Sequence, residues 1–225
     1  MIGKSKLIAV IPAKKNSSRL KKKNLQKLGK YSLVEKAILY AKSLNEVDKV
    51  IVSTDCKKIY KVAKKYKFNE KKLRDKKLSR KYSLTSDVII KIIKENHFEN
   101  DYILLLQPTT PFRNKKDFKN LLKKFKSKKD KAIVSIIKNN FIHPYKTLKL
   151  KNKYLKPFFG RETNFPRQKL RDVYASNGAF YLIKGSTLIK YKTFIPPKTA
   201  FYEMPQLRSI NIDYPEDLKI AKSII

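Results

Sequence analysis

Short apolar runs alternate with segments of helical spacing along residues 6–137, and this alternation constrains the fold more than any other feature of the sequence. The apolar runs cover residues 6–12, 49–53, 102–106 and 132–137. Between them, apolar residues recur three and four positions apart at 33–44, 57–66, 87–96 and 116–125. This alternation predicts an α/β fold, Rossmann-like, with a mostly parallel central sheet and helices on both faces.

The pattern changes at about residues 141–171, where aromatic residues and prolines surround an alternating stretch, TLKLKNKYLKPF. A turn at Asn152 predicts that this stretch forms an inserted β-hairpin arm. Beyond it we expect strands at 177–183 and 208–212 and a final helix at about 214–224. A chain of 225 residues with 41% hydrophobic content suits one core. We therefore expect one domain over 1–225 with the arm inserted.

The chain carries an exceptional positive charge, with 55 Lys and Arg against 18 Asp and Glu and a net charge of +37. Such an excess attracts polyanions. The lysines are nevertheless spread over the whole chain, many on the expected outer faces of helices, such as Lys57, Lys61 and Lys64. Zinc-ligand spacing, a helix-turn-helix signature and an RNA-recognition motif are not found. A basic nucleic-acid or polyanion-binding protein is therefore kept only as an alternative.

Compartment signals in the sequence favour the cytoplasm. The longest apolar stretches fall far short of the roughly 20 residues that span a bilayer. The N-terminal segment, MIGKSKLIAVIPA, has an apolar run too brief for a signal peptide. The single cysteine, Cys56, fits a reducing compartment. We expect no contact with a membrane.

A basic and polar loop, residues 13–24 (AKKNSSRLKKKN), follows the first expected strand. Ligands of open α/β sheets bind beyond the carboxyl ends of the strands, which is where this loop lies. Cations, hydroxyls and backbone amides are what a triphosphate requires, because its charge must be neutralised and its oxygens hydrogen-bonded. The loop has no glycine and no Walker A motif, so P-loop chemistry is not expected.

Two further polar clusters follow expected strands. The segment 104–113 (LLLQPTTPFR) has two prolines that fix a loop, with Gln107 and Arg113 among its polar side chains. In 208–217 (RSINIDYPED), Asp213 ends the expected strand and could hold a hard cation beside phosphate oxygens. Glu216 and Asp217 suit the first turn of the following helix.

Six segments resemble, in the same order, the motifs of the acylneuraminate cytidylyltransferase family: residues 8–24, 49–55, 104–113, 166–168 (PRQ), 177–181 (NGAFY) and 210–218. The resemblance covers essentially the whole chain. It implies a nucleotide-diphospho-sugar transferase fold, a homodimer built through the arm, and Mg²⁺ as the cofactor. The implied reaction transfers CMP from CTP to the anomeric hydroxyl of a nine-carbon acidic sugar, a nonulosonic acid such as sialic or legionaminic acid, and releases pyrophosphate.

Residue roles follow from matching motif positions. The resemblance implies that Lys23 contacts the triphosphate and Asn24 the ribose, with Ser17 also in place in the nucleotide loop. Lys14 stands where the family usually has arginine, so a bidentate fork becomes a point charge. Arg74 and Thr85 match positions near the cytosine. The residues implied to face the sugar acid are Gln107, Lys146, Arg167 and Tyr181, with Phe194 as an apolar wall. The implied catalytic set is Lys14, Lys23 and Asp213, the last also holding the metal.

Besides Lys14, three positions depart from the family pattern. Asn211 replaces one of two acids on the late segment, Ala175 replaces an arginine before the NG pair, and Lys81 stands where an acid is common. A near alternative is a cytidylyltransferase for the eight-carbon acid Kdo, but that branch typically has aspartate where this chain has Thr109. The sequence leaves the identity of the nonulosonic acid open.

Overall fold

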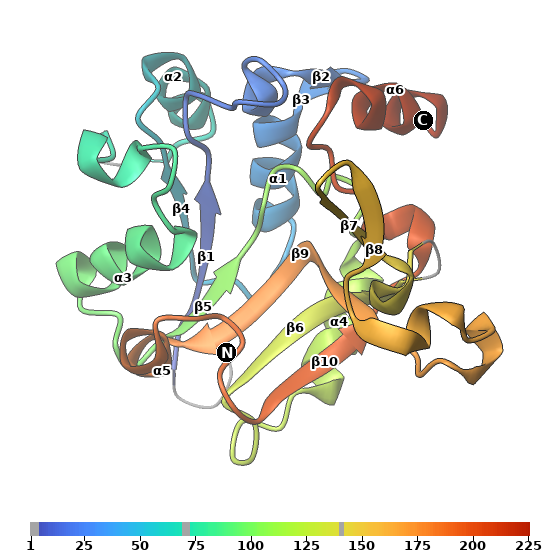
Figure 1. The fold of residues 1–225 in the computed structure, drawn as a ribbon. Helices are drawn as coiled ribbons and strands as arrows, with labels where there is room; N and C mark the ends of the chain where they lie inside the picture. The colour runs from blue at the N-terminus through green and yellow to red at the C-terminus, as the bar shows by residue number, and fades with distance from the viewer. Residues whose placement is uncertain (1–4, 69–72, 140–141) are drawn as a thin grey trace.

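The computed structural model describes residues 5–68, 73–139 and 142–225 and has a six-stranded mixed sheet at its centre (Figure 1). The strand order is β10-β6-β9-β5-β1-β4. Only β9 among these strands runs antiparallel to its neighbours, β5 and β6. The strands are β1 (Leu7–Pro12), β4 (Lys49–Ser53), β5 (Tyr102–Leu105), β6 (Ala132–Lys138), β9 (Tyr174–Lys184) and β10 (Thr199–Glu203). The expected mostly parallel α/β fold is confirmed.

Helices cover both faces of the sheet because the central strands are apolar on both sides. In β1, Leu7, Ala9 and Ile11 pack with the helices α1 (Leu33–Lys42), α2 (Lys57–Lys65) and α4 (Lys115–Lys124). Ile8 and Val10 point the other way, toward α3 (Thr85–Asn96) and α5 (Gly185–Tyr191). Alternate side chains of a strand face opposite sides, so one apolar run serves two core clusters.

A third core cluster joins the C-terminal helix α6 (Pro215–Ser223) to the loop after β1. It contains Leu20 and Leu28 from the N-terminal part of the chain and Ile212, Leu218 and Ala221 from the C-terminal part. Leu28 belongs to a small antiparallel ribbon formed by β2 (Lys27–Leu28) and β3 (Tyr31–Ser32). Segments far apart in sequence thus meet above the carboxyl end of β1. Among the described residues, every helix is too short or too polar to span a bilayer.

Short 3₁₀ turns complete the element list: Lys23–Leu25, Lys76–Ser79, Pro144–Lys146, Gly160–Asn164, Arg167–Lys169 and Gln206–Ser209. The last of these corrects the sequence prediction of a strand at 208–212. Residues Arg208 and Ser209 belong to the turn, and residues 210–212 have no ladder partner. Their alternation reflects Ile210 and Ile212 packing into the third cluster instead of sheet pairing. The strand β10 and the helix α5 were not expected from the sequence.

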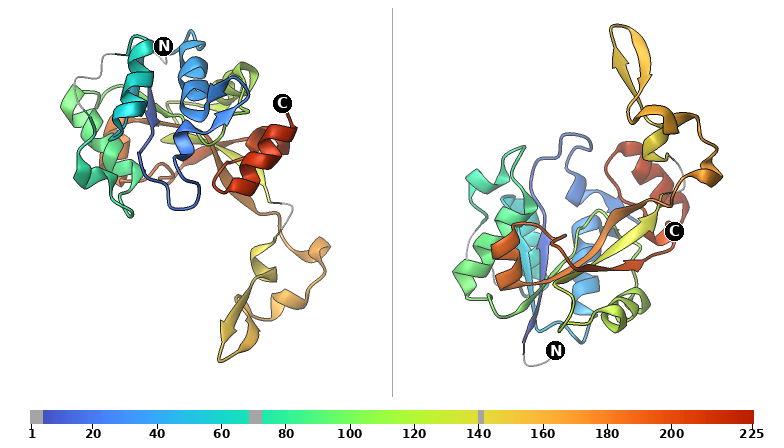
Figure 2. Two further views of the ribbon diagram at one scale, coloured as in Figure 1. Left: turned by 90° about the horizontal axis from the view of Figure 1, so that it is seen from above. Right: turned by 60° about the horizontal axis from the view of Figure 1, so that its bottom comes forward.

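The inserted arm leaves the body between β6 and β9 and extends away from it (Figure 2). Its hairpin pairs β7 (Leu148–Lys151) with β8 (Tyr154–Pro157) in antiparallel register. Asn152 and Lys153 form the turn in the left-handed region, with φ of 49° and 67°. The predicted hairpin is therefore present. Phe141, where the arm was expected to begin, lies outside the described residues.

Candidate active site

A cavity of about 280 Å³ opens at the carboxyl ends of β1 and β5. Its lining comes from the loop after β1, the segment before α3, the loop after β5 and the segment before α6. Seven of the residues expected at the site line it together: Lys14, Lys23, Asn24, Arg74, Thr85, Gln107 and Asp213. Cations and a carboxylate therefore share one hollow, at the sheet edge where α/β proteins bind ligands.

The loop after β1 is closed on itself, and two of its lysines, Lys14 and Lys23, line the cavity. Asn24, 7% exposed, donates from Nδ2 to the Lys14 carbonyl at 2.9 Å. Lys22 takes a left-handed conformation with φ 52°, just before the turn that carries Lys23. Asn24 is thus committed to holding the loop, and its expected contact with ribose remains a prediction. Ser17 is half-buried in the same loop and is not among the residues that line the cavity.

The Asp213 carboxylate lies among three side-chain donors. Lys23 Nζ is 2.5 Å from its Oδ1, and Arg19 Nη1 is 3.1 Å from its Oδ2. Asn211 Nδ2 donates to Oδ2 at 3.2 Å. The side chain of Asn211, which stands where the family has an acid, therefore points toward Asp213. The loop after β1 and the segment before α6 are joined at this carboxylate.

Asp217 holds the backbone around Asp213. Its Oδ2 accepts from the backbone N–H groups of Asp213 at 2.8 Å and of Tyr214 at 2.7 Å. This is the first-turn capping role expected from the sequence, and it leaves Asp217 engaged at the start of α6. Within the described residues, no group of three or more His, Cys, Asp or Glu side chains is placed to hold a metal ion.

The donor set nevertheless fits a magnesium ion that is bound mostly through substrate. Mg²⁺ in nucleotide enzymes is commonly held by one or two carboxylates, with phosphate oxygens and water completing the octahedron. Asp213 supplies one carboxylate, and Asn211 supplies an amide oxygen beside it if its side chain turns over. Lys14 and Lys23 line the same cavity, where they would face the phosphates.

Arg74 is fixed against the end of β4. Its Nε donates to Ser53 Oγ at 3.0 Å and its Nη2 to the Ser53 carbonyl at 2.5 Å. Burial lowers the pKa of Arg74, while Asp55 acts in the opposite sense. Thr85 begins α3 and lines the cavity together with Arg74.

The loop after β5 is locked by a buried arginine. Arg113 donates from Nη2 to the Gln107 carbonyl and from Nη1 to the Ala179 carbonyl, both at 2.7 Å. Its guanidinium lies over the rings of Tyr40 and Phe180. Burial lowers the pKa of Arg113 to about 10. Arg113 is thus a structural cation beneath the site.

Gly178 makes room for the Gln107 side chain. The sequence showed this glycine only as part of the NG pair and did not indicate its contact with Gln107. Its φ is 78°, and a Cβ at this position would lie 2.5 Å from Gln107 Oε1. Asn177, the other member of the pair, is buried and accepts from Ser135 Oγ at 2.6 Å. A glycine next to a buried asparagine therefore shapes the wall that carries Gln107.

Replacing Gly178 by alanine is expected to displace the Gln107 side chain, and so to raise the KM of a substrate bound beside it, and to lower the free energy of unfolding by about 1–3 kcal/mol, since a left-handed non-glycine residue is strained. Gly29→Ala is the matched control. Gly29 also has positive φ, 64°, but its added Cβ would meet only Ile225 Cδ1 at 3.9 Å. Steady-state kinetics and thermal melts of both variants test this. Equal kinetic effects in the two variants would refute a specific link to Gln107.

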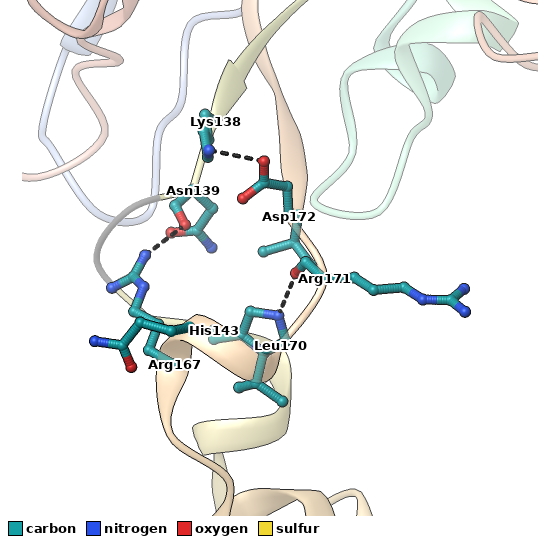
Figure 3. A pocket seen from close by; sticks show the side chains of 9 residues that line it. Lys138, Asn139, His143, Arg167, Leu170, Arg171 and Asp172 are labelled. Atoms are coloured by element: carbon teal, nitrogen blue, oxygen red, sulfur yellow. Dashed lines mark hydrogen bonds and ion pairs between the residues drawn. The ribbon is translucent and has the colours of Figure 1, made fainter.

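The arm residues expected at a sugar site lie outside this cavity. Lys146 Nζ donates to the Thr163 and Phe165 carbonyls, both at 2.6 Å, within the arm itself. Arg167 Nη2 donates to the Asn139 carbonyl at 3.1 Å and lines a separate cavity of about 300 Å³ at the arm root (Figure 3). Whether these two residues serve a sugar site in another subunit stays a prediction.

At the root of the arm, the outgoing segment (Lys138 and His143) and the returning segment (Arg171 and Asp172) are joined by polar contacts. Lys138 pairs with Asp172 at 2.7 Å, and His143 Nε2 lies 2.9 Å from the Arg171 carbonyl (Figure 3). His143 Nδ1 accepts from the Tyr145 backbone N–H at 3.2 Å, which fixes the proton on Nε2. These contacts hold the direction in which the arm leaves the sheet.

The structure also places Tyr181 and Phe194 apart from the cavity. Their rings pack together with centroids 5.6 Å apart, in the core cluster on the α3 and α5 face. Tyr181 pairs with Leu105 across β5 and β9 and so shares that face. Their geometry in this chain is that of core packing, and it does not bring them to Gln107. Arg19, expected only as one of the cations of the basic loop, reaches Asp213.

The chain is similar over almost its whole length to known cytidylyltransferases. The chain is 27% identical over 223 residues to a pseudaminic acid cytidylyltransferase of Campylobacter jejuni subsp. jejuni serotype O:2, covering 96% of this chain and 95% of that protein. It is 27% identical over 228 residues to a CMP-N,N'-diacetyllegionaminic acid synthase of Legionella pneumophila subsp. pneumophila, covering 98% of this chain and 96% of that protein.

A solved structure with a similar fold is a CMP:2-keto-3-deoxy-manno-octonic acid synthetase in complex with CTP. It aligns with a TM-score of 0.69 at 16% identity and covers 98% of both chains. At that identity the likeness concerns the fold. The cytidylyltransferase family model matches residues 8–219 of this chain. The chain is thus a nucleotidyltransferase that belongs to the cytidylyltransferase family.

Proposed function

We propose that this cytidylyltransferase transfers CMP from CTP to the anomeric hydroxyl of a nonulosonic acid and releases pyrophosphate. The observation that carries the proposal is the cavity at the end of β1, which collects Lys14, Lys23 and Asp213. Cations for a triphosphate and a carboxylate for its metal are what nucleotidyl transfer needs. The relatives named for pseudaminic and legionaminic acid support the sugar class.

The reaction we propose is an in-line displacement at the α-phosphorus of CTP. Lys14 and Lys23 neutralise the charge that develops on the leaving pyrophosphate, while Arg74 and Thr85 hold the nucleotide at the other side of the cavity. Gln107 faces the sugar acid. Positioning and electrostatics supply most of the catalysis in such transfers, so no side-chain nucleophile is required.

Mg²⁺ is the proposed cofactor, held by Asp213 with help from Asn211. When bound, it would supply positive charge to the phosphates of CTP and Lewis acidity that lowers the pKa of the attacking hydroxyl. With one carboxylate in the set, its affinity depends on the phosphates of CTP, so metal and nucleotide are expected to bind together. We further propose that the enzyme acts in the cytoplasm, where CTP is available.

The direct test is pyrophosphate release with CTP and Mg²⁺ over a panel of acids: pseudaminic, N,N'-diacetyllegionaminic, N-acetylneuraminic and the eight-carbon acid Kdo. We expect turnover with at least one nonulosonic acid and little with Kdo. Preference for Kdo would favour the eight-carbon alternative, and no turnover with any of the four would refute the proposed substrate class. CTP binding measured on its own would show whether the nucleotide half of the proposal survives.

We also propose that the arm forms a homodimer and carries Lys146 and Arg167 to the partner's sugar site. The support is a group of large apolar side chains that the arm is too thin to bury. Those more than 60% exposed are Ile142, Leu150, Tyr154 and Leu155. Leu150 and Leu155 are register partners on one face of the hairpin, and exposed apolar side chains placed together in this way are typical of a protein interface.

Replacing Leu150 and Leu155 together by glutamate is expected to convert the dimer to a monomer and to lower turnover of the sugar acid. The two residues face each other across β7 and β8 and are 74% and 66% exposed. Burying two carboxylates in an apolar interface opposes association. Light scattering at micromolar concentration measures the outcome. The control is Lys149→Gln with Lys156→Gln, which changes the opposite face of the hairpin and should leave the dimer intact. A glutamate variant that remains a dimer with full activity would contradict the proposal.

A further inference from the structure

The segment that carries Asp213 is not held by sheet pairing. Residues 210–213 follow the 3₁₀ turn Gln206–Ser209 without regular structure. The backbone N–H of Ile212 donates to the Thr109 carbonyl at 2.8 Å, and the fully buried Ile212 side chain packs into the third core cluster. A metal-binding carboxylate must be placed within fractions of an ångström. The position of Asp213 must therefore depend on the contacts made by the residues that precede it.

Directly upstream, Arg208 is clamped by a fully buried carboxylate. Arg208 Nε donates to Asp117 Oδ2 and Arg208 Nη2 to Asp117 Oδ1, both at 2.9 Å. The Asp117 side chain is 0% exposed and that of Arg208 is 35% exposed. Such a fork has one geometry, because both oxygens and two guanidinium nitrogens are engaged at once.

The remaining contacts of Asp117 make it a rigid anchor. Its Oδ2 accepts from the backbone N–H of Asn114 at 3.1 Å in the capping box that starts α4. Tyr202 in β10 donates its hydroxyl to Oδ1 at 3.2 Å. The turn that carries Arg208 has a second tie, from Asn177 Nδ2 to Ser209 Oγ at 2.9 Å.

These contacts connect the two halves of the cavity. Asp117 belongs to the helix that follows the Gln107 loop, and Arg208 belongs to the segment that leads to Asp213. The hydrogen bond from Ile212 to Thr109 links the same two segments nearer the cavity. The distance between the sugar-facing loop and the metal-facing carboxylate is therefore set by a short series of buried polar contacts.

We propose that Arg208 and Asp117 are positioning residues that fix the Asp213 carboxylate at the metal-binding end of the cavity. The inference rests on the proposed function, in which Mg²⁺ and CTP meet at Asp213. Neither residue lines the cavity. Changing them is therefore expected to reduce the gain in CTP affinity that Mg²⁺ provides. The affinity for CTP in the absence of metal should stay the same.

The test compares the dissociation constant for CTP, measured by calorimetry, in EDTA and in saturating Mg²⁺. The main variant is Asp117→Asn with Arg208→Gln, which removes both charges and leaves no unpaired buried ion. We expect the gain in affinity from Mg²⁺ to shrink about 10- to 100-fold, as when groups that orient metal ligands are changed. Affinity in EDTA should stay near that of the wild type. Asp213→Asn sets the benchmark for complete loss of the gain.

Two further variants keep the inference falsifiable. Arg208→Lys keeps a charge beside Asp117 but loses the fork, so a smaller loss in the same direction is expected; it decides the question if the double variant does not fold. Tyr202→Phe removes one hydroxyl contact of Asp117 and leaves the fork to Arg208 in place, so a smaller loss of the gain than in the double variant is expected. A folded double variant, or a folded Arg208→Lys, with the wild-type gain would overturn the proposal. Absence of any gain in the wild type would instead count against the proposed metal site.

Discussion

Asp213→Ala is expected to reduce Mg²⁺-dependent turnover by about 10³-fold while leaving the protein folded. A bound metal contributes several kcal/mol to such a transition state, and each ~1.4 kcal/mol is a factor of ten in rate. Among the described residues that line the cavity, Asp213 has the one acidic side chain. Its side chain is 28% exposed and its partners reach solvent, so the lost ion pairs should cost little stability.

The measurement is a titration of pyrophosphate release with Mg²⁺, together with a thermal melt. Asn211→Asp is the complementary variant. Because Asn211 Nδ2 lies 3.2 Å from Asp213 Oδ2, a carboxylate at position 211 would stand beside the first and strengthen a site for a hard dication. The Mg²⁺ concentration for half-maximal rate should then fall. Activity that survives in Asp213→Ala would refute the metal assignment, and an unchanged titration in Asn211→Asp would show that residue 211 does not reach the metal.

The central sheet was predictable because several of its strands are short apolar runs with sharp limits. The runs that became β1, β4 and β5 are continuous apolar stretches bounded by polar residues or proline, and their predicted limits hold within one residue. The helices α1 to α4 were predictable for a related reason, since each has a stripe of apolar residues opposite lysines. α2, for example, buries only Ile59 and Ala63.

The errors arose where side chains alternate for reasons other than sheet pairing. In 208–212, Arg208 and Ser209 have buried polar partners while Ile210 and Ile212 enter a core cluster, which produces a strand-like pattern in a segment without a ladder. β10 was missed because it pairs only with β6 and leaves Phe201 exposed, so its sequence lacks an apolar run.

The candidate site was predictable to the extent that strand-end loops converge. Motif positions identified Lys14, Lys23, Gln107 and Asp213, and the sheet brings them together. Contacts that depend on the direction of a side chain could not be predicted from the sequence. Tyr181 lies on the α3 and α5 face because its neighbour Phe180 takes the opposite one. Likewise, nothing in the sequence shows that Gly178 is required by the amide of Gln107.

Lys23→Ala is expected to lower kcat/KM for CTP about 30- to 1000-fold, because a positioned donor to developing charge in such a site contributes roughly 2 to 4 kcal/mol. Lys23 is suited to this role since its side chain is only 18% exposed and its Nζ already lies 2.5 Å from Asp213 Oδ1. A metal bound at Asp213, as proposed, would release this ammonium group to turn toward the phosphates. Both kcat and KM should change, since the contact is made to bound nucleotide and to the leaving pyrophosphate.

Lys21→Ala is the control, because Lys21 is exposed in the same loop and does not line the cavity. It removes the same charge from the overall field of a chain with net charge +37, so any effect of long-range steering appears in both variants. Steady-state kinetics with varied CTP separate the two. Equal losses in Lys21→Ala and Lys23→Ala would mean that the loop acts by general attraction of anions, and wild-type kinetics in Lys23→Ala would remove the triphosphate from this loop. A loss confined to Lys23→Ala would instead tie the effect to one ammonium group, poised between the metal-binding carboxylate and the leaving pyrophosphate.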